Sequence, residues 1–281
     1  MNFTRRDWMW LAAAAVAIAI LGFRVSSQTH RNGAAAAVLT ATRIIQLPVS
    51  YVENGEVPRD RLALSAGAED ELPNGPASFD VAADGTVVLT DPLKQRLVYF
   101  DSEGRFVKDV ALGFTPREVW LGNDGTPRVQ ASGGMWLEPA GDGQARETDF
   151  QPDAPRPDSA RRTGPDRGFV LGDAPGMAER GGFPVLVPEG LASIEKLGRD
   201  AKGRIYVALE EPMPGDEIEV RKVIRKYAAD GTLLAEIRDV PLDYFVEPVR
   251  EFRIKSDGKV YQLVARDNLV AINVWDTAGV P

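Results

Sequence analysis

Glycine-containing turns recur along this chain at a nearly fixed interval, and this repeat constrains the fold more than any other feature. The first turn glycines are Gly85, Gly125, Gly164, Gly203 and Gly258, which are spaced 40, 39, 39 and 55 residues apart. The second turn glycines are Gly104, Gly143, Gly182, Gly231 and Gly279. An insertion around residues 211–216 accounts for much of the longest interval. A period of this length is typical of a chain built from repeated supersecondary units.

The unit at Phe79–Val110 shows what one repeat contains. It reads FDVAADG, TVVLTDPLKQ, RLVYFDSEG and RFVKDV, four short apolar segments separated by two turns and one loop. Short apolar runs bounded by turn residues predict β-strands. Four strands in a unit of about 40 residues are typical of a β-propeller blade. We therefore expect an all-β fold over residues 41–281, a β-propeller of five to six four-stranded blades, with room for the sixth blade in residues 48–78 or in an irregular stretch.

Apolar residues keep the same phase in several units. Six and four residues before the first turn glycine stand Phe79 and Val81, Val119 and Leu121, and Phe252 and Ile254. Because side chains alternate between the two faces of a strand, each pair should share a face and pack on the neighbouring blade. Large aromatic side chains should supply the bulk of this packing. They are Trp120, Trp136, Trp275, Tyr206 and Tyr261.

Two units depart from the pattern. Residues 141–168 are rich in Pro, Asp and Arg, which favours either a degenerate blade or a long surface loop. The last unit contains Val274–Gly279, which echoes Tyr99–Gly104, but it lacks a fourth strand. The apolar segment Ala41–Leu47 has no unit of its own. We predict that this segment fills the open edge of the last blade and closes the ring.

One blade resembles a known repeat. The stretch Pro76–Gly85, followed by Val87–Asp91 and Arg96–Asp101, is similar to the NHL-type repeat and to the six-bladed propeller proteins that many bacteria export. The match is good over this blade and partial over three more. Asp91 and Arg96 stand where that repeat commonly has an Asp and an Arg, which we interpret as a clamp between strands. The resemblance implies a fold and no single activity, because this fold hosts lyases, lactonases and binding platforms.

The N-terminus carries a membrane-targeting pattern. Two arginines precede the uncharged run Trp8–Phe23, and Arg24 ends it. A helix of this length spans roughly 24 Å, which is short of the ~30 Å hydrocarbon core but enough for a thin or locally thinned bilayer. Positive charge before the run places the N-terminus in the cytoplasm and the propeller on the periplasmic or extracytoplasmic side. We interpret residues 1–24 as a transmembrane anchor or export signal on the bacterial cytoplasmic membrane, and residues 25–40 as a linker.

The processing of this segment stays open at the level of sequence. Thr4–Met9 resembles a twin-arginine export signal. Small residues at Val25–Ser27 and Ala34–Ala37 suit cleavage by a signal peptidase. The alternative is an uncleaved, single-pass anchor, and an anchored domain is held at high local concentration beside a membrane complex.

Composition removes several classes of chemistry. The chain has no cysteine, which excludes disulfides, thiolate metal sites and cysteine nucleophiles. Its one histidine is His30, in the linker, so Ser-His-Asp catalysis and histidine-based zinc sites cannot be built. The formal charge of −8 argues against nucleic-acid binding.

Carboxylates are the remaining candidates for chemistry. Glu118 and Glu251 lie seven residues before their turn glycines, and Asp80 and Glu195 lie nearby in their own units. On a propeller these four residues would surround one mouth of the channel and could hold calcium, as in propeller lactonases. The alternative is that they are solvated charges at strand ends. A separate acidic loop contains Glu210, Glu211, Asp216, Glu217 and Glu219, and it is either a solvated hairpin or a docking surface for a basic partner.

Two functions are consistent with these patterns. The first is a non-enzymatic, membrane-anchored propeller that binds or stabilises a membrane protein complex, for example an energy-transducing one, with no cofactor of its own. The second is a calcium-dependent hydrolase or lyase of the propeller lactonase type. Calcium chemistry requires several oxygen ligands around one ion, so convergence of the four carboxylates discriminates between the two.

Overall fold

The computed structural model describes residues 36–122, 124–141, 143–150, 161–163, 168–170, 184–186, 193–213, 219–229, 231–242 and 244–279. The chain divides into two units, Met1–Ala36 and Ala37–Pro281, and all the described strands belong to the second. The predicted anchor at residues 1–24 and His30 lie outside the described residues. Within the part of the chain that the structure describes, no helix is long and apolar enough to cross a membrane.

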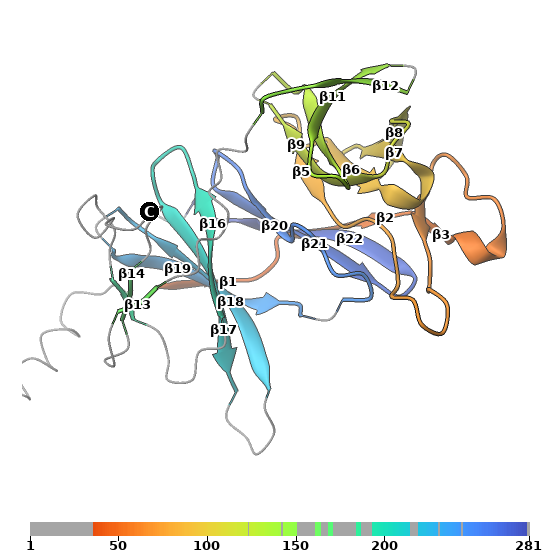
Figure 1. Ribbon diagram of the computed structural model, residues 1–281. Coiled ribbons are helices and arrows are strands. Elements are labelled where there is room, and N and C mark those ends of the chain that lie inside the picture. The colour runs from red at the N-terminus through yellow and green to blue at the C-terminus, as the bar shows by residue number, and fades with distance from the viewer. Residues whose placement is uncertain are drawn as a thin grey trace, which may run out of the picture. The chain divides into compact units, whose positions relative to one another are not determined.

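Two four-stranded antiparallel sheets form the first half of the described fold (Figure 1). The first sheet runs in chain order through β5 (Phe79–Val81), β6 (Val87–Asp91), β7 (Arg96–Phe100) and β8 (Phe106–Ala111). The second runs likewise through β9 (Pro116–Leu121), β10 (Pro127–Ala131), β11 (Trp136–Gly141) and β12 (Gln144–Glu147). The first sheet coincides with the repeat predicted at Phe79–Val110. Up-and-down sheets of four short strands are the kind from which propeller blades are made.

The second half contains two larger sheets. One consists of β16 (Ser193–Arg199), β17 (Ile205–Pro212), β18 (Val220–Tyr227) and β19 (Leu233–Val240), with β1 (Ala37–Leu39) added to its edge. The other consists of β20 (Phe252–Ile254), β21 (Lys259–Arg266), β22 (Leu269–Asp276) and β2 (Arg43–Leu47). These strands, with those of the first two sheets, confirm the predicted all-β fold. The number of blades stays a prediction.

The remaining elements are short. Within residues 141–192, the described strands β13 (Arg161–Thr163), β14 (Gly168–Val170) and β15 (Pro184–Leu186) form a three-stranded sheet. Residues 48–78, where a sixth blade had room, hold only the parallel pair β3 (Val49–Tyr51) and β4 (Leu62–Leu64) and the 3-10 turn η1 (Val52–Asn54). A second 3-10 turn, η2 (Pro92–Lys94), connects β6 to β7.

Hydrophobic clusters join neighbouring sheets as the phase of the apolar residues predicts. Phe79 and Val81 of β5 pack with residues of β21 and β22, including Leu263 and Ile272. Val119 of β9 belongs to a cluster with Val88 and Tyr99 of the first sheet. Phe252 and Ile254 of β20 pack with Tyr206 and Ile224 of the β16–β19 sheet. Inner-strand residues therefore provide the apolar contacts between consecutive sheets.

The polar residues of the first repeat have structural roles. The buried Arg96 Nε donates to Asp91 Oδ2 at 2.9 Å, which confirms the predicted clamp between β6 and β7. Arg96 also donates to the carbonyl of Arg61 at 2.5 Å, which ties β7 to the chain segment before β4. At the second turn, Gly104 has φ +83°, and a Cβ there would collide with the carbonyl oxygen of Gln46 in β2. Only glycine suits a position with both constraints.

The N-terminal strap, which we define as residues 37–47, joins two sheets. Its first strand, β1, pairs in parallel with β19. Its second strand, β2, pairs antiparallel with β22, with Ile45 opposite Ile272. Figure 1 shows β2 beside the blue strands of the C-terminal sheet. The prediction that Ala41–Leu47 supplies the missing fourth strand of the last repeat is confirmed.

The acidic loop has a different environment from the one predicted. Glu211 is not a solvated charge, because it is only 4% exposed and forms ion pairs with Arg221 and Arg225 of β18. Arg225 in turn pairs with Glu236 of β19 at 2.7 Å. Asp216 and Glu217 lie outside the described residues.

Candidate functional site

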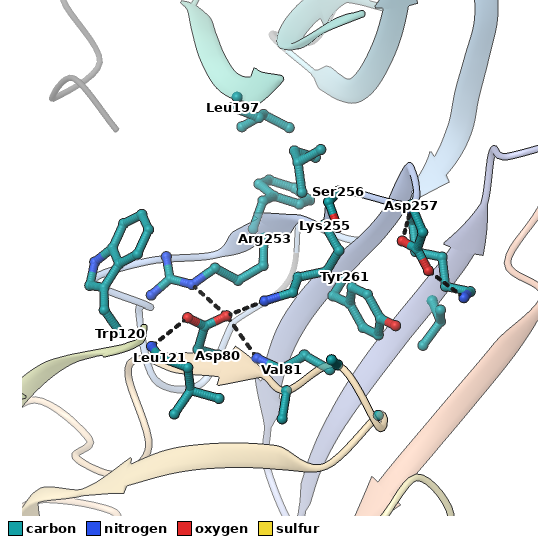
Figure 2. A pocket seen from close by; sticks show the side chains of 18 of the residues that line it. Asp80, Val81, Trp120, Leu121, Leu197, Arg253, Lys255, Ser256, Asp257 and Tyr261 are labelled. Atoms are coloured by element: carbon teal, nitrogen blue, oxygen red, sulfur yellow. Dashed lines mark hydrogen bonds and ion pairs between the residues drawn. The ribbon is translucent and has the colours of Figure 1, made fainter. Parts of the chain in front are cut away.

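A cavity of 1480 Å³ is lined by the first strands of four sheets, β5, β9, β16 and β20, by turns beside them and by residues of β2, β21 and β22. It is the cavity that we identify as the candidate site. Its wall is polar, with seven basic and six acidic side chains. Figure 2 shows the region where Asp80 of β5, Trp120 of β9 and Arg253 of β20 meet.

Strand periodicity explains why charged residues line this wall. In β20 and the residue that comes after it, Arg253 and Lys255 alternate with Phe252 and Ile254, which pack into the core. Asp80 likewise lies between the core residues Phe79 and Val81. The side chains of a strand alternate between its two faces. A strand that packs its apolar side chains on a neighbouring sheet therefore directs the intervening charged side chains to its opposite face.

Asp80 is the centre of this region. Its Oδ2 accepts a hydrogen bond from the backbone N–H of Leu121 at 2.8 Å, and its Oδ1 accepts one from Val81 at 2.7 Å. The Lys255 ammonium lies 3.2 Å from Oδ1. The carboxylate of Asp80 is thus engaged by two backbone amides and a lysine that come from three different strands or turns.

Glu118 is engaged in the same way. Its Oε1 accepts a hydrogen bond from the Trp120 indole at 3.0 Å and forms an ion pair with the Arg250 guanidinium. The Arg250 guanidinium also lies over the Trp120 ring, 5.1 Å from its centroid. Charge pairing and cation–π contact together fix the Trp120 ring at the wall of the cavity.

Arg253 is the least satisfied group of the site. It is 5% exposed, and its Nη2 donates to the carbonyl of Val119 at 2.7 Å. Its Nε and Nη1 are buried and have no hydrogen-bond partner among the described residues. The nearest carboxylate oxygen to Nε is Oδ1 of Asp80, at 3.7 Å. The Trp120 ring covers the guanidinium at 4.5 Å. Burial lowers the pKa of Arg253 to about 10, so the group is still charged at neutral pH.

Glu251 and Glu195 lie at a second polar cluster. Glu251 forms an ion pair with Lys222 at 2.6 Å, accepts from Gln262 at 2.8 Å and contacts the Tyr244 hydroxyl. Glu195 lines the cavity, and burial together with the negative charge of Glu251 raises its pKa. This part of the site therefore favours a protonated Glu195.

The four carboxylates predicted as calcium ligands are not arranged as one shell. Asp80 and Glu195 line the cavity, whereas Glu118 and Glu251 are held by Arg250 and Lys222. Among the described residues, no three His, Cys, Asp or Glu side chains are grouped as a metal site. The donor set as it stands suits basic and amide partners better than a cation, because three of the four carboxylates carry an ion pair with Lys255, Arg250 or Lys222.

Sequence reasoning missed the basic side of this wall. Trp120 was expected in packing between blades, but its ring also lines the cavity. Arg253 and Lys255 were not singled out, although their alternation with Phe252 and Ile254 is visible in the sequence. An arginine between two core positions of an inner strand is the signal that would have indicated a buried cation.

Comparison with known proteins leaves the function open. No family model matches the chain, and no curated protein matches it. A gluconolactonase from Xanthomonas campestris is similar at 13% identity, with 85% of this chain and 89% of that chain covered and a TM-score of 0.28. BamB from Moraxella catarrhalis is similar at 13% identity, with 85% and 99% covered and a TM-score of 0.28.

A third solved structure shows a similar level of likeness. BBS1N in complex with ARL6DN matches at 13% identity, with 74% of this chain and 68% of that chain covered and a TM-score of 0.26. TM-scores of this size do not establish a common fold or function. Any functional conclusion therefore rests on the sheet order and on the wall of the cavity.

Proposed function

We propose that this protein is a membrane-anchored, extracytoplasmic β-propeller that acts as a non-enzymatic binding or stabilising subunit of a membrane protein complex. The observation that carries this proposal is the pairing of the carboxylates at the cavity. Asp80 and Glu118 are held by Lys255 and Arg250, which belong to a different sheet or its connection. Fixed charge pairs shape a wall for recognition, whereas a neighbouring cation makes a carboxylate a weaker general base and a weaker metal ligand.

The rest of the sequence supports binding. The whole chain has no cysteine, and it has one histidine, His30, in the predicted linker, which argues against a nucleophile activated by a histidine base. The hydrophobic run after two arginines supports a tether at the membrane, with the propeller outside the cytoplasm. A tether raises the local concentration of a binding module beside a membrane partner.

Purification from native membranes in a mild detergent tests the proposal. We expect an intact mass that includes the residues before Val25, together with partner proteins at fixed stoichiometry. A mass that begins near Gln28 or later, with no protein bound, would contradict the anchored subunit. Export of a reporter fused after Pro281 checks the predicted side of the membrane independently.

Calcium-dependent hydrolysis is the competing function. A calcium ion bound to Asp80 or Glu118 would compete with Lys255 or Arg250 for the negative charge of the carboxylate. We therefore expect about 1 mM calcium to leave the melting temperature unchanged, since a ligand that binds only the native state raises it. A calcium-dependent rise that is lost in Asp80→Asn would favour the hydrolase instead.

A further inference from the structure

The charges where β20 meets β5 and β9 do not cancel. Arg250, Arg253 and Lys255 bring three positive charges, whereas Asp80 and Glu118 bring two negative ones. Two short ion pairs account for four of these groups, Arg250 with Glu118 and Lys255 with Asp80. Arg253 is left with contacts of 3.7 Å and 3.9 Å to those same carboxylates. The surplus charge therefore lies on the most buried cation of the three.

The N–H donors of Arg253 lead to the same conclusion, that a negatively charged partner is missing. A guanidinium has five N–H donors in a rigid fork that matches a carboxylate. Nη2 donates to Val119, while the buried Nε and Nη1 have no acceptor in the part of the chain that the structure describes. Buried donors without acceptors are destabilising, and each calls for an explanation, such as an ordered water, an ion or a bound ligand.

We propose that the cavity binds a carboxylate group, which pairs with the Arg253 guanidinium beside Lys255 and Arg250. One carboxylate supplies the single negative charge that balances the cluster. A dianion such as a phosphate would add a second charge next to Asp80 and Glu118, which disfavours it. The inference deepens the proposed function and rests on it in one respect, that the cavity is a binding site.

The Trp120 ring covers one face of the proposed site. The ring lies 4.5 Å from the Arg253 guanidinium and is half-buried, so its displacement exposes the covered nitrogens. The side chain of Lys255 is 27% exposed and can shift toward an incoming anion. Figure 2 shows Trp120, Arg253 and Lys255 around Asp80 at this point. Binding should therefore change the fluorescence of Trp120.

The cavity volume allows two sources for the carboxylate. Pockets for small ligands measure about 300–1,000 Å³, and this cavity, at 1480 Å³, is larger. A free organic acid and the acidic side chain of an extended peptide present the same group to Arg253. Glutarate and a short peptide with one glutamate are suitable probes for the two sources. Glutaramide and the same peptide with glutamine are their neutral counterparts.

The test uses the full chain purified in detergent, without any partner protein. We expect glutarate or the glutamate peptide to quench Trp120 emission and to raise the melting temperature, with no response to the neutral counterparts. In Arg253→Met the apparent affinity should fall at least tenfold, and in Trp120→Phe the quenching should disappear. Arg105→Gln is the matched control, because Arg105 is an exposed arginine outside the cavity, and it should bind as the wild type does.

A structural role for Arg253 makes a different prediction. If its charge serves stability alone, Arg253→Met lowers the melting temperature without ligand, and acidic and neutral probes act alike on the wild type; this result overturns the inference. If Arg253 is kept for binding, the ligand-free variant is at least as stable as the wild type. Arg253→Lys keeps the positive charge. We expect this variant to fold more readily than Arg253→Met and to retain part of the affinity.

The outcomes also distinguish the two sources of the ligand. In addition, they distinguish failure of the carboxylate site from failure of the anchored subunit. A response to glutarate identifies a free acid as sufficient, and a response to the peptide alone identifies a peptide side chain, and both support the carboxylate site. Because no partner is present, a failed titration leaves the co-purification test of the anchored subunit unaffected. A successful titration of a protein that purifies alone would support the site and contradict the complex.

Discussion

The indole nitrogen of Trp275 in β22 donates to Asp239 Oδ1 of β19 at 2.9 Å, a hydrogen bond from one sheet to the next. The other oxygen of the same carboxylate accepts from the backbone N–H of Ala41, also at 2.9 Å. Ala41 lies between β1 and β2 in the N-terminal strap. The Asp239 side chain therefore connects β19, the strap and Trp275, the largest fully buried side chain of the described core.

Removing this carboxylate should destabilise the fold. Asp239→Ala leaves the Trp275 nitrogen, which is inside the core, without its acceptor. We expect a loss of about 1–3 kcal/mol in the free energy of unfolding, measured by urea denaturation. Asp70→Ala, at an exposed aspartate, should stay within about 0.5 kcal/mol of the wild type. Equal effects at the two positions would show that Asp239 does not connect the sheets.

The strap offers a test with two adjacent residues. Ile45 is 2% exposed in the cluster shared with the first sheet, whereas Ile44 is 58% exposed on the opposite face of β2. Ile45→Ala should cost about 2–5 kcal/mol through lost burial and the cavity that it leaves. Ile44→Ala should change the free energy of unfolding by less than about 0.5 kcal/mol. The reverse order would mean that β2 is shifted by one residue relative to β22.

Two Asp–Arg pairs in the first sheet allow burial to be compared. Arg96 and Asp91 have side chains that are 6% and 0% exposed, while Arg105, which pairs with Asp101, is 73% exposed. Arg96→Met leaves a buried carboxylate without its partner and should cost about 3–5 kcal/mol. Arg105→Met should cost less than about 1 kcal/mol. Similar losses in the two variants would contradict a buried clamp.

Glu195 predicts how stability depends on pH. Burial and the charge of Glu251 raise its pKa, so the folded state favours the protonated carboxyl. Its contribution to stability is complete below the ordinary glutamate pKa, about 4.3, and is lost as the pH rises through the higher folded value. Glu195→Gln should therefore raise the melting temperature at pH 7 and have little effect near pH 4. Glu69→Gln, the same substitution at an exposed glutamate, is the control.

The fold was largely predictable because the repeat is local. The unit Phe79–Val110 shows its own strands, turns and apolar phase, so its division into four strands follows from local sequence alone. The pairing of Ala41–Leu47 with the last repeat was predictable too, because this apolar segment has no unit of its own and the last repeat lacks a fourth strand. Asp91 and Arg96 are five residues apart and share one hairpin, which made their pairing visible as well.

The site was much less predictable. The distance of Glu118 from a turn glycine, and the nearby position of Asp80 in its own unit, indicate which end of a strand they occupy but nothing of the groups opposite them. Their partners Lys255 and Arg250 are 175 and 132 residues away in the chain. The Trp120 ring that packs over Arg253 belongs to another sheet. Ion pairing and burial of this kind depend on contacts between sheets, which a single sequence does not show.

The pairing of β2 with β22 has a consequence for synthesis. Residues 43–47 are synthesised long before their partner residues 270–274. The nascent chain must therefore carry the apolar Ile44–Ile45 segment unpaired while more than two hundred further residues are added. Long-range pairing of this kind is slow and exposes a strand edge to aggregation. We expect this protein to depend on a chaperone until its C-terminal hairpin is complete.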